Sequence, residues 1–293
     1  MADTSPSSDR PAIADTDASA EQAAVGLANT PDAVERYRDL AIGMYLYWTV
    51  DAQFGMVNAH SVIGASAAYH DRYFNELPRT FNPERFDARW YARLAKLCGF
   101  DYVTVCPKNH NGFCMWDTAT TPFNVMNTPF GRDVMREFVE AFGEVGLPVS
   151  FYFSPDDAWH QWSHGAEPAR VRPHALPPNN PGLLAHDLGQ LTELVEGYGP
   201  AMMCFDHPDP TVMRPLIEHV WSLNRNVMIT RGVLPTPEQH LQEITGPYEA
   251  HFTIGTQWQY KAGNDRNKTG RELIELLANI RGHGGTLLLA IGG

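Results

Sequence analysis

The residues best suited to catalysis stand at the ends of the hydrophobic, β-rich segments of the chain. Asp206 ends one such segment, Arg231 ends the next, and Glu238 follows on the loop TPEQ. His110 comes just after an earlier segment, and Tyr152 lies near the end of another. Two carboxylates beside a cation, an imidazole and aromatic rings suit the binding of a sugar, whose hydroxyls need hydrogen bonds and whose C–H faces stack on rings. An Asp after a strand is also a common helix N-cap, and that interpretation stays open for Asp206.

These side chains meet only if the segments that carry them are neighbouring parallel strands. Six β-rich segments, at 42–48, 102–107, 148–154, 201–206, 225–231 and 285–291, alternate with helical patterns at 86–98, 131–145, 186–198, 211–223 and 269–282. Such alternation predicts parallel β-α-β units with right-handed crossovers. No glycine-rich phosphate loop follows the first segment, which favours an α/β fold of the (β/α)8-like, TIM-type barrel class over an open doubly wound sheet. The catalytic end of a barrel is the C-terminal end of its strands.

The helical patterns carry their own start and stop signals. The stretch RFDARWYARLAKLCG places Phe86, Trp90 and Leu94 on one face and ends at Gly99. The stretch GRDVMREFVEAFGEVG repeats this arrangement and ends at Gly146. Both patterns predict helices that pack one face against the sheet.

Domain organisation follows from a change in composition. Residues 1–30 are rich in Ala, Ser, Asp and Thr and contain no aromatic residue, which predicts a disordered leader. Residues 31–293 form the expected catalytic barrel domain. The chain begins with no basic segment followed by a hydrophobic one, and it contains no apolar run of membrane-spanning length. We therefore expect a cytoplasmic protein without a membrane partner.

The charge balance argues against nucleic-acid binding. The chain has 22 Lys and Arg against 34 Asp and Glu, a formal charge of −12, and no basic run. A small-molecule partner, a glycoside or a similar compound, is expected instead, and the oligomeric state stays open. The four cysteines form no CxxC pair and are expected to be reduced. His160 and His164 have a zinc-compatible spacing but lack the Glu of zinc peptidases, so we expect neither a metal nor another cofactor.

The segment FNPERFDARWYARLAKLCGFDYVTVCPKNHNGFCMWDTATTPFNV resembles the signature of the α-L-fucosidase family of glycoside hydrolases. In that signature a Lys-His-His-Asp-Gly-Phe run precedes Trp/Phe-Asp-Ser/Thr. Further stretches agree with the family in the same order, namely VSFYFSPDDAWH, QLTELVEGYGPAMMCFD, VMITR, PYEAHFTIGTQWQYKAGN and GGTLLLAIGG. The resemblance runs from about residue 40 to the end of the chain. It implies a retaining exo-glycosidase with a distorted barrel, here as a single domain without the C-terminal β-sandwich that family members often have.

The resemblance also implies roles for individual residues. Asp206 matches the nucleophile of the family's Trp-Phe-Asp motif, and Glu238 is similar to the acid/base of the branch that carries Thr-Pro-Glu-Gln. The remaining matched positions imply substrate contacts, at Tyr47, Trp48, Asn109, His110, Trp116, Tyr152 and Arg231. Glu249 resembles a supporting carboxylate and competes for the acid/base role. His207, next to Asp206, could tune that carboxylate or be satisfied within its loop.

Retaining hydrolysis places demands on the two carboxylates. They stand about 5–5.5 Å apart, one attacking the anomeric carbon while the other protonates the leaving oxygen. We expect Asp206, beside Arg231, to stay ionised as the nucleophile. Glu238, on a loop, is expected to have a raised pKa and to alternate between acid and base.

Several positions depart from the family pattern. Tyr47 and Asn109 stand where the family has histidines that read the sugar, and Asn111 replaces the Asp of the His-His-Asp run. The loop NAHSVIGASAAYHD lacks an obvious counterpart of the family's Glu-Trp-Tyr. We expect the chemistry to be retained with an altered choice of sugar. Two alternatives stay open: a non-hydrolytic biosynthetic enzyme that uses the carboxylates as acid and base, and an inactive sugar-binding relative.

Overall fold

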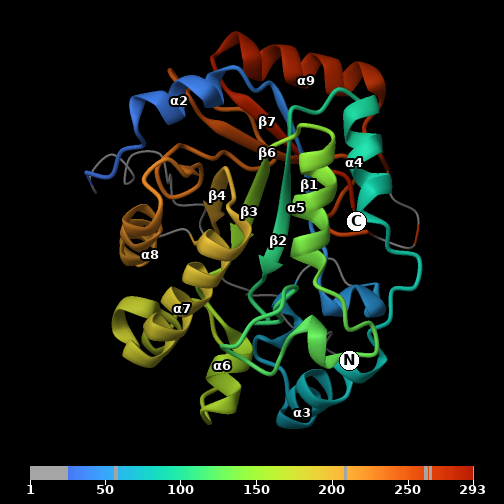
Figure 1. Ribbon diagram of the computed structural model, residues 1–293, viewed down its shortest axis with the longest axis vertical. Coiled ribbons are helices and arrows are strands. Elements are labelled where there is room, and N and C mark those ends of the chain that lie inside the picture. The colour runs from blue at the N-terminus through green and yellow to red at the C-terminus, as the bar shows by residue number, and fades with distance from the viewer. Residues whose placement is uncertain (1–25, 56–58, 208–209, 261–262, 264–265, 293) are drawn as a thin grey trace, which may run out of the picture.

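A computed structural model describes residues 26–55, 59–207, 210–260, 263 and 266–292, which form one α/β domain (Figure 1). No β-sandwich occurs within these ranges. Most of the expected leader, residues 1–25, lies outside the described residues. Asn29 belongs to the folded domain, because its side-chain amide donates to the backbone oxygen of Ile229 and accepts from the backbone N–H of the same residue, both at 2.8 Å. That residues 1–25 form a disordered leader stays a prediction.

The domain is built on one curved sheet of parallel strands. The strands are β1 (Ile42–Leu46), β2 (Tyr102–Lys108), β3 (Val149–Phe153), β4 (Met202–Phe205), β5 (Met228–Ile229), β6 (Glu249–Thr253) and β7 (Thr286–Ala290). Their order is β5-β4-β3-β2-β1-β7-β6, and every ladder is parallel. The C-terminal ends of all the strands therefore lie on one side of the domain. This arrangement confirms the predicted fold class.

The barrel is distorted between β5 and β6. No regular ladder joins these two strands within the described residues, and the chain that follows β5 runs beside β6 instead. Backbone oxygens of Pro235 and Pro237 accept from the N–H groups of Glu249 and His251, at 3.1 and 2.9 Å. Because a proline has no N–H to donate, this segment accepts hydrogen bonds from the N–H groups of β6 but does not form a regular strand. Glu238 lies in this irregular segment.

Helices surround the sheet (Figure 1). They are α2 (Pro31–Arg38), α3 (Ala67–Asn75), α4 (Ala88–Leu97), α5 (Val134–Glu144), α6 (Ala158–Ser163), α7 (Pro181–Tyr198), α8 (Pro210–Leu223) and α9 (Gly270–Gly282). In Figure 1, α2 and α9 lie at the top, and α3 and α6 lie at the bottom, toward which the β2 arrow points. The C-terminal ends of the strands therefore face α3 and α6.

The predicted elements differ from the structure at several places. Helices α2, α3 and α6 were not predicted, and α7 and β6 differ as follows. Helix α7 begins at Pro181 rather than at residue 186, because the Asn180 side chain caps it and proline suits the first helical turn. Strand β6 was missing from the predicted strands. Its sequence EAHFT carries an acid and an imidazole, yet all five residues are buried. The residues that pair with and pack against this strand are distant in the sequence. A local hydrophobic pattern therefore could not reveal it.

The interior of the barrel is aromatic and partly polar. Tyr45, Tyr102 and Tyr152 are buried there together with Cys106 and Cys204. The Tyr45 and Tyr152 rings lie 5.4 Å apart between centroids. This packed interior forms the floor beneath the C-terminal ends of the strands.

Candidate active site

Asp206 is the centre of the charged groups at the C-terminal end of the sheet. It follows β4 directly, and its backbone N–H donates to the oxygen of Phe153 at 2.9 Å, which fixes its place beside β3. Its carboxylate contacts His110 Nε2 at 2.6 Å, Arg231 Nη1 at 2.8 Å and Arg170 Nη2 at 3.6 Å. Burial alone would raise the pKa of Asp206, but these three cations hold it well below its usual range. Asp206 is therefore ionised, as expected.

Arg231 joins the two candidate catalytic carboxylates. Its Nη1 contacts Asp206 Oδ1 at 2.8 Å, and its Nη2 contacts Glu238 Oε1 at 2.6 Å. The Glu238 side chain is 37% exposed, whereas that of Asp206 is 12% exposed. The two carboxylates thus share one guanidinium, with Glu238 on the side nearer to solvent.

The charge of Glu238 differs from the expectation. Burial raises its pKa, but Arg231 and His251 outweigh burial and lower the pKa below the ordinary glutamate value. The expected raised pKa of Glu238 is therefore wrong for the free site. A cation in direct contact stabilises the carboxylate, and the TPEQ motif by itself gives no sign of that contact.

Glu249 lies below the site. Its carboxylate accepts from the Tyr102 hydroxyl at 2.8 Å and contacts His251 Nε2 at 2.8 Å. The side chain is 1% exposed. The sequence left the acid/base role open between Glu238 and Glu249, and the structure places Glu238, not Glu249, at the cavity.

The charged groups surround a cavity of about 120 Å³. Its walls combine acids, bases and aromatic rings, contributed by Tyr45, Tyr47, His60, His110, Tyr152, Arg170, Asp206, Glu238, His251 and Trp258. The Tyr47 ring meets the Tyr152 ring edge to face, with centroids 6.0 Å apart. Such a surface offers both hydrogen-bonding groups and ring faces to a ligand.

His110 is held between two acids. Its Nδ1 contacts Asp156 Oδ1 at 2.9 Å, and its Nε2 contacts Asp206 Oδ2 at 2.6 Å. Burial and the nearby Arg170 lower the pKa of His110, but the two carboxylates raise it above the ordinary value overall. Both ring nitrogens therefore donate, and His110 is a cation that supports the charge of Asp206.

The family model described as Alpha-L-fucosidase matches residues 13–293 of this chain. The chain belongs to the α-L-fucosidase family. The members of this family are glycoside hydrolases, and the resemblance seen in the motifs is confirmed.

Individual members of the α-L-fucosidase family match at moderate identity. The putative α-L-fucosidase 1 of Oryza sativa subsp. japonica is 34% identical over 125 residues, which are 42% of this chain and 22% of that protein. The α-L-fucosidase 1 of Arabidopsis thaliana is 31% identical, with the same coverage of 42% and 22%. The matched segment thus spans about a fifth of these curated relatives. The structure of α-L-fucosidase isoenzyme 1 from Paenibacillus thiaminolyticus superimposes with a TM-score of 0.73 at 28% identity, over 89% of this chain and 70% of that one.

Tyr47 and Asn109, where the α-L-fucosidase family has histidines, lie in different surroundings. Tyr47 lines the cavity. Asn109 is 1% exposed and is not among the lining residues, and its Oδ1 accepts the backbone N–H of His110 at 2.7 Å. Asn111 is also buried and donates to Thr49 and to the Tyr73 hydroxyl. Of the altered positions, Tyr47 is the one placed to touch a ligand.

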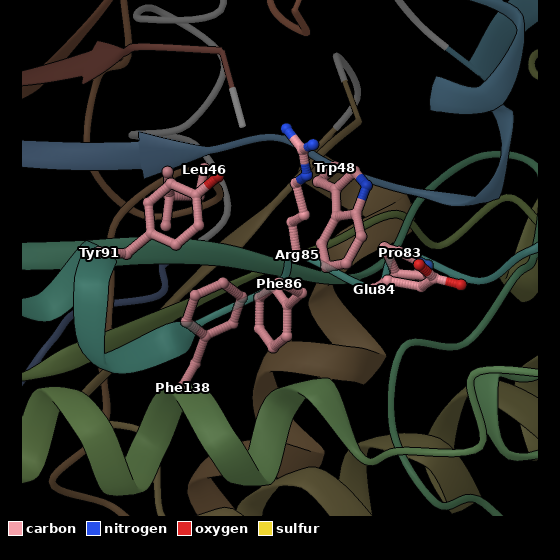
Figure 2. A pocket seen from close by; sticks show the side chains of 8 residues that line it. All are labelled: Leu46, Trp48, Pro83, Glu84, Arg85, Phe86, Tyr91 and Phe138. Atoms are coloured by element: carbon pink, nitrogen blue, oxygen red, sulfur yellow. The ribbon is translucent and has the colours of Figure 1, made fainter.

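The structure does not bring the two expected tryptophans to this cavity. Trp48 turns to the other face of the sheet, where its ring stacks on Phe86 at 5.1 Å and lines a separate cavity of about 400 Å³ with Tyr91 and Phe138 (Figure 2). Trp116 is fully buried and donates to Glu193 at 3.0 Å. Their expected substrate contacts are therefore wrong in this structure. Successive side chains after a strand alternate in direction, so Tyr47 and Trp48 cannot both face the interior.

Several residues at the site escaped the sequence analysis. His60 comes from the loop that shows no counterpart of the family's Glu-Trp-Tyr, and its ring lies 4.7 Å from that of His110. Burial, His110 and Arg170 lower the pKa of His60 to about 3, so it is neutral. Arg170 contacts His60 at 3.0 Å and Asp156 at 3.2 Å. His60 lies in a single turn of 3-10 helix (Ala59–Val62) and Arg170 lies in a loop, and no local pattern distinguishes them from ordinary polar surface residues. His207 is buried beside Asp206 but does not line the cavity.

One group of side chains has the composition of a metal site. Within the described ranges, Cys204, Glu249 and His251 place potential ligand atoms within 4.8 Å of one another. Within this group, His251 Nε2 and Glu249 Oε2 lie 2.8 Å apart, which is a hydrogen-bond distance. Burial also raises the pKa of the Cys204 thiol well above its usual value, so its thiolate is disfavoured. The group is better described as a hydrogen-bonded acid–imidazole pair.

None of the helices in the described part of the chain has the length and hydrophobicity of a membrane span.

Proposed function

We propose that this chain is a retaining glycoside hydrolase that removes a terminal α-L-fucose, or a close stereochemical relative of it, from a small glycoside. The observation that carries the proposal is the sharing of Arg231 by Asp206 and Glu238 at one cavity. Retaining hydrolysis needs two carboxyl groups on either side of the scissile bond, one of them ionised. The names of the related plant and Paenibacillus proteins support an α-L-fucoside as the substrate class.

The first half of the reaction uses both carboxylates. Asp206, kept ionised by its three cations, attacks the anomeric carbon and forms a glycosyl ester as the bond to the leaving oxygen breaks. Protonated Glu238 delivers its proton to that oxygen. In the second half, Glu238 takes a proton from water, the hydroxide adds to the anomeric carbon, and Asp206 leaves as a carboxylate.

The small cavity suits one sugar ring. Its volume of about 120 Å³ favours a monosaccharide unit over a longer chain. Tyr47, Tyr152 and Trp258 offer ring faces to the sugar, and His60 offers a neutral imidazole to its hydroxyls. Arg170 and Arg231 already pair with carboxylates of the protein. The substrate therefore needs no anionic group to balance their charge.

The test uses aryl glycosides and one nucleophile variant. The protein is expected to release the phenol from an aryl α-L-fucoside or α-L-galactoside. Asp206→Ala should lower this turnover by at least about 10³-fold, and azide should restore part of it by attacking from the vacated side to give a β-glycosyl azide. The product is identified by mass spectrometry and NMR.

A control variant separates loss of chemistry from loss of fold. Glu84→Ala changes an exposed acid that does not line the cavity of Asp206 and should leave turnover unchanged. The proposal fails if folded wild-type protein releases no phenol from any of these glycosides between pH 4 and 9. It also fails if azide gives no glycosyl azide with a folded Asp206→Ala variant that has lost turnover.

A further inference from the structure

A chain of buried polar groups leads from the barrel interior to Glu238. The Tyr102 hydroxyl donates to Glu249 Oε1 at 2.8 Å, and Glu249 Oε2 contacts His251 Nε2 at 2.8 Å. His251 Nδ1 faces Glu238 Oε1 at 3.8 Å. Tyr102 and Glu249 are fully buried and His251 is 1% exposed, yet His251 still lines the cavity. An imidazole fixed by a buried carboxylate thus stands between the protein interior and the candidate acid/base.

The pairing with Glu249 decides which ring nitrogen of His251 can exchange a proton. Glu249 already accepts a hydrogen from Tyr102, and its other oxygen needs a donor, so His251 keeps a proton on Nε2. The second nitrogen, Nδ1, is then the atom that gains or loses a proton. A carboxylate that fixes the tautomer of a histidine in this way also stabilises its imidazolium form. The exchangeable nitrogen is the one that faces Glu238.

The charged groups around His251 favour its protonated form. Burial and Arg231 lower the pKa of His251, but Glu238 and Glu249 raise it above the ordinary histidine value overall. The other titratable groups nearby are Tyr102 from β2 and Cys204 from β4, both of which burial keeps neutral. The cation therefore stands between two carboxylates.

Counting charges shows why a stored proton is needed. Four acids around the cavity, Asp156, Asp206, Glu238 and Glu249, meet four cations, His110, Arg170, Arg231 and His251. Glu238 is ionised in this arrangement, so it has no proton of its own for a leaving group. Two of the cations are guanidiniums, which do not release protons. The ring nitrogens of His110 contact Asp156 and Asp206 rather than Glu238. His251 is the acid that remains next to Glu238.

We propose that His251, held by Glu249, stores the proton that Glu238 delivers to the leaving oxygen. This inference rests on the proposed glycoside hydrolysis. When substrate binds, the Glu238–His251 contact shortens by about 1 Å to a hydrogen bond, and the Nδ1 proton moves to Glu238. Glu238 then protonates the glycosidic oxygen as that oxygen leaves the anomeric carbon, which becomes bonded to Asp206. The result is a neutral His251, an ionised Glu238, a neutral alcohol and a glycosyl ester.

The second half of the reaction restores the stored proton. Water loses one proton to Glu238, which passes it to His251 Nδ1, and the hydroxide replaces Asp206 at the anomeric carbon. Every proton is accounted for, and His251 ends as the imidazolium. His251 is thus a positioning and proton-storing residue that acts through Glu238.

The first experiment compares leaving groups. His251→Gln should lower kcat/KM by about 10²-fold for an alkyl or phenyl α-L-fucoside, whose leaving oxygen needs a proton. It should lower kcat/KM less than about 5-fold for a dinitrophenyl α-L-fucoside, whose leaving group departs without one. The control His283→Gln removes an exposed histidine at the end of α9 and should change neither value. An equal loss on both substrates would mean that His251 has only a structural role.

The pH profile supplies a second kinetic test. The alkaline limb of kcat/KM reports loss of the stored proton. Glu249→Gln removes the carboxylate that raises the pKa of His251, so the limb should move to lower pH by about 1 unit. A limb that stays in place in Glu249→Gln overturns the proposal.

A third measurement does not depend on turnover. The ¹⁵N shifts of His251, assigned by comparison with His251→Gln, should show an imidazolium in the wild-type protein at pH 7 and a neutral Nε2–H tautomer in Glu249→Gln. If His251 is already neutral in the wild type at pH 6, the inference is wrong whether or not fucosides are cleaved. If the imidazolium is present but no glycoside is turned over, the proposed function fails and this proton store has no reaction to serve.

Discussion

At the scale of single residues, the site is governed by the number of cations around one carboxylate. His110, Arg170 and Arg231 all contact Asp206, and the pKa of Asp206 falls although burial opposes it. The cations therefore lower the pKa of Asp206 by more than its burial raises it. We therefore expect Asp206, the proposed nucleophile, to be ionised at neutral pH.

Replacing Arg231 tests this balance. In Arg231→Gln, Asp206 and Glu238 lose their shared cation, so the pKa of Asp206 rises. Because a carboxylate with a depressed pKa loses its charge only at low pH, the wild-type acid limb of kcat/KM should lie below about pH 4. The variant's limb should move up by at least about 1 unit, with kcat/KM about 10²-fold lower at its optimum.

The measurement is a pH–rate profile with an aryl α-L-fucoside. Arg89→Gln is the matched control, because Arg89 pairs with Glu144 on the exposed surface of α4 and α5. Its profile should match the wild type. An acid limb that does not move in Arg231→Gln would show that the remaining cations alone keep Asp206 ionised.

At the scale of elements, the loop after β2 is locked to the start of α6. The backbone oxygens of His110 and Asn111 accept from the N–H groups of Ala158 and Trp159, at 2.9 and 3.2 Å. Asp157 caps α6 by accepting the backbone N–H of His160 at 2.7 Å. These bonds hold the His110 ring against Asp206, so the short helix α6 positions the site although it does not reach it.

Gly112 makes this close packing possible. Its φ is +83°, and a Cβ at this position would lie 2.1 Å from Asp157 Oδ1. Gly112→Ala should therefore lower the free energy of unfolding by about 2–3 kcal/mol, through the left-handed backbone and the displaced buried acid. Urea denaturation measures this loss. Gly146→Ala is the control: its φ is +72° with open space around the Cβ, so it should cost only about 1 kcal/mol. Equal losses in the two variants would rule out the contact with Asp157.

At the scale of the whole molecule, a second charged cluster ties the sheet to two helices. Lys108, at the end of β2, contacts Asp187 of α7 at 2.6 Å and Asp157 at the start of α6 at 3.5 Å. All three side chains are fully buried, and the lysine ammonium also lies 4.4 Å from the centre of the Phe153 ring. A buried cation with two acids joins elements that are far apart in the sequence.

Removing the cation should destabilise the domain strongly. Lys108→Met leaves buried Asp187 without its cation and leaves Asp157 with only His186, at 3.3 Å, so the free energy of unfolding should fall by about 3–5 kcal/mol. Adding Asp187→Asn removes one of those charges and should recover part of the loss. Both variants are compared by urea denaturation. If the double variant is less stable than Lys108→Met, the unpaired charge is not the cause of the loss.

Much of this protein could be predicted from the sequence alone, because the signals were local. Strands that alternate with helices determine a parallel sheet, and a parallel sheet brings all the C-terminal strand ends to one side. Asp206, Tyr152 and Arg231 lie at or just beyond such ends, and the structure does bring them together. The capped helices at 88–97 and 134–144 lie within the predicted ranges for the same reason.

Only the tertiary structure decided the direction of side chains, the paths of loops and the charges of buried groups. Trp48 turns away from the cavity, whereas His60, Arg170 and His251 reach it from segments with no distinctive pattern. The pKa of Glu238 is lowered rather than raised because Arg231 contacts it, and that contact depends on how the chain between β5 and β6 folds back. Local sequence determines which backbone conformations are favoured. Electrostatic interactions depend on distances between residues that are remote in the chain, and only the folded structure sets those distances.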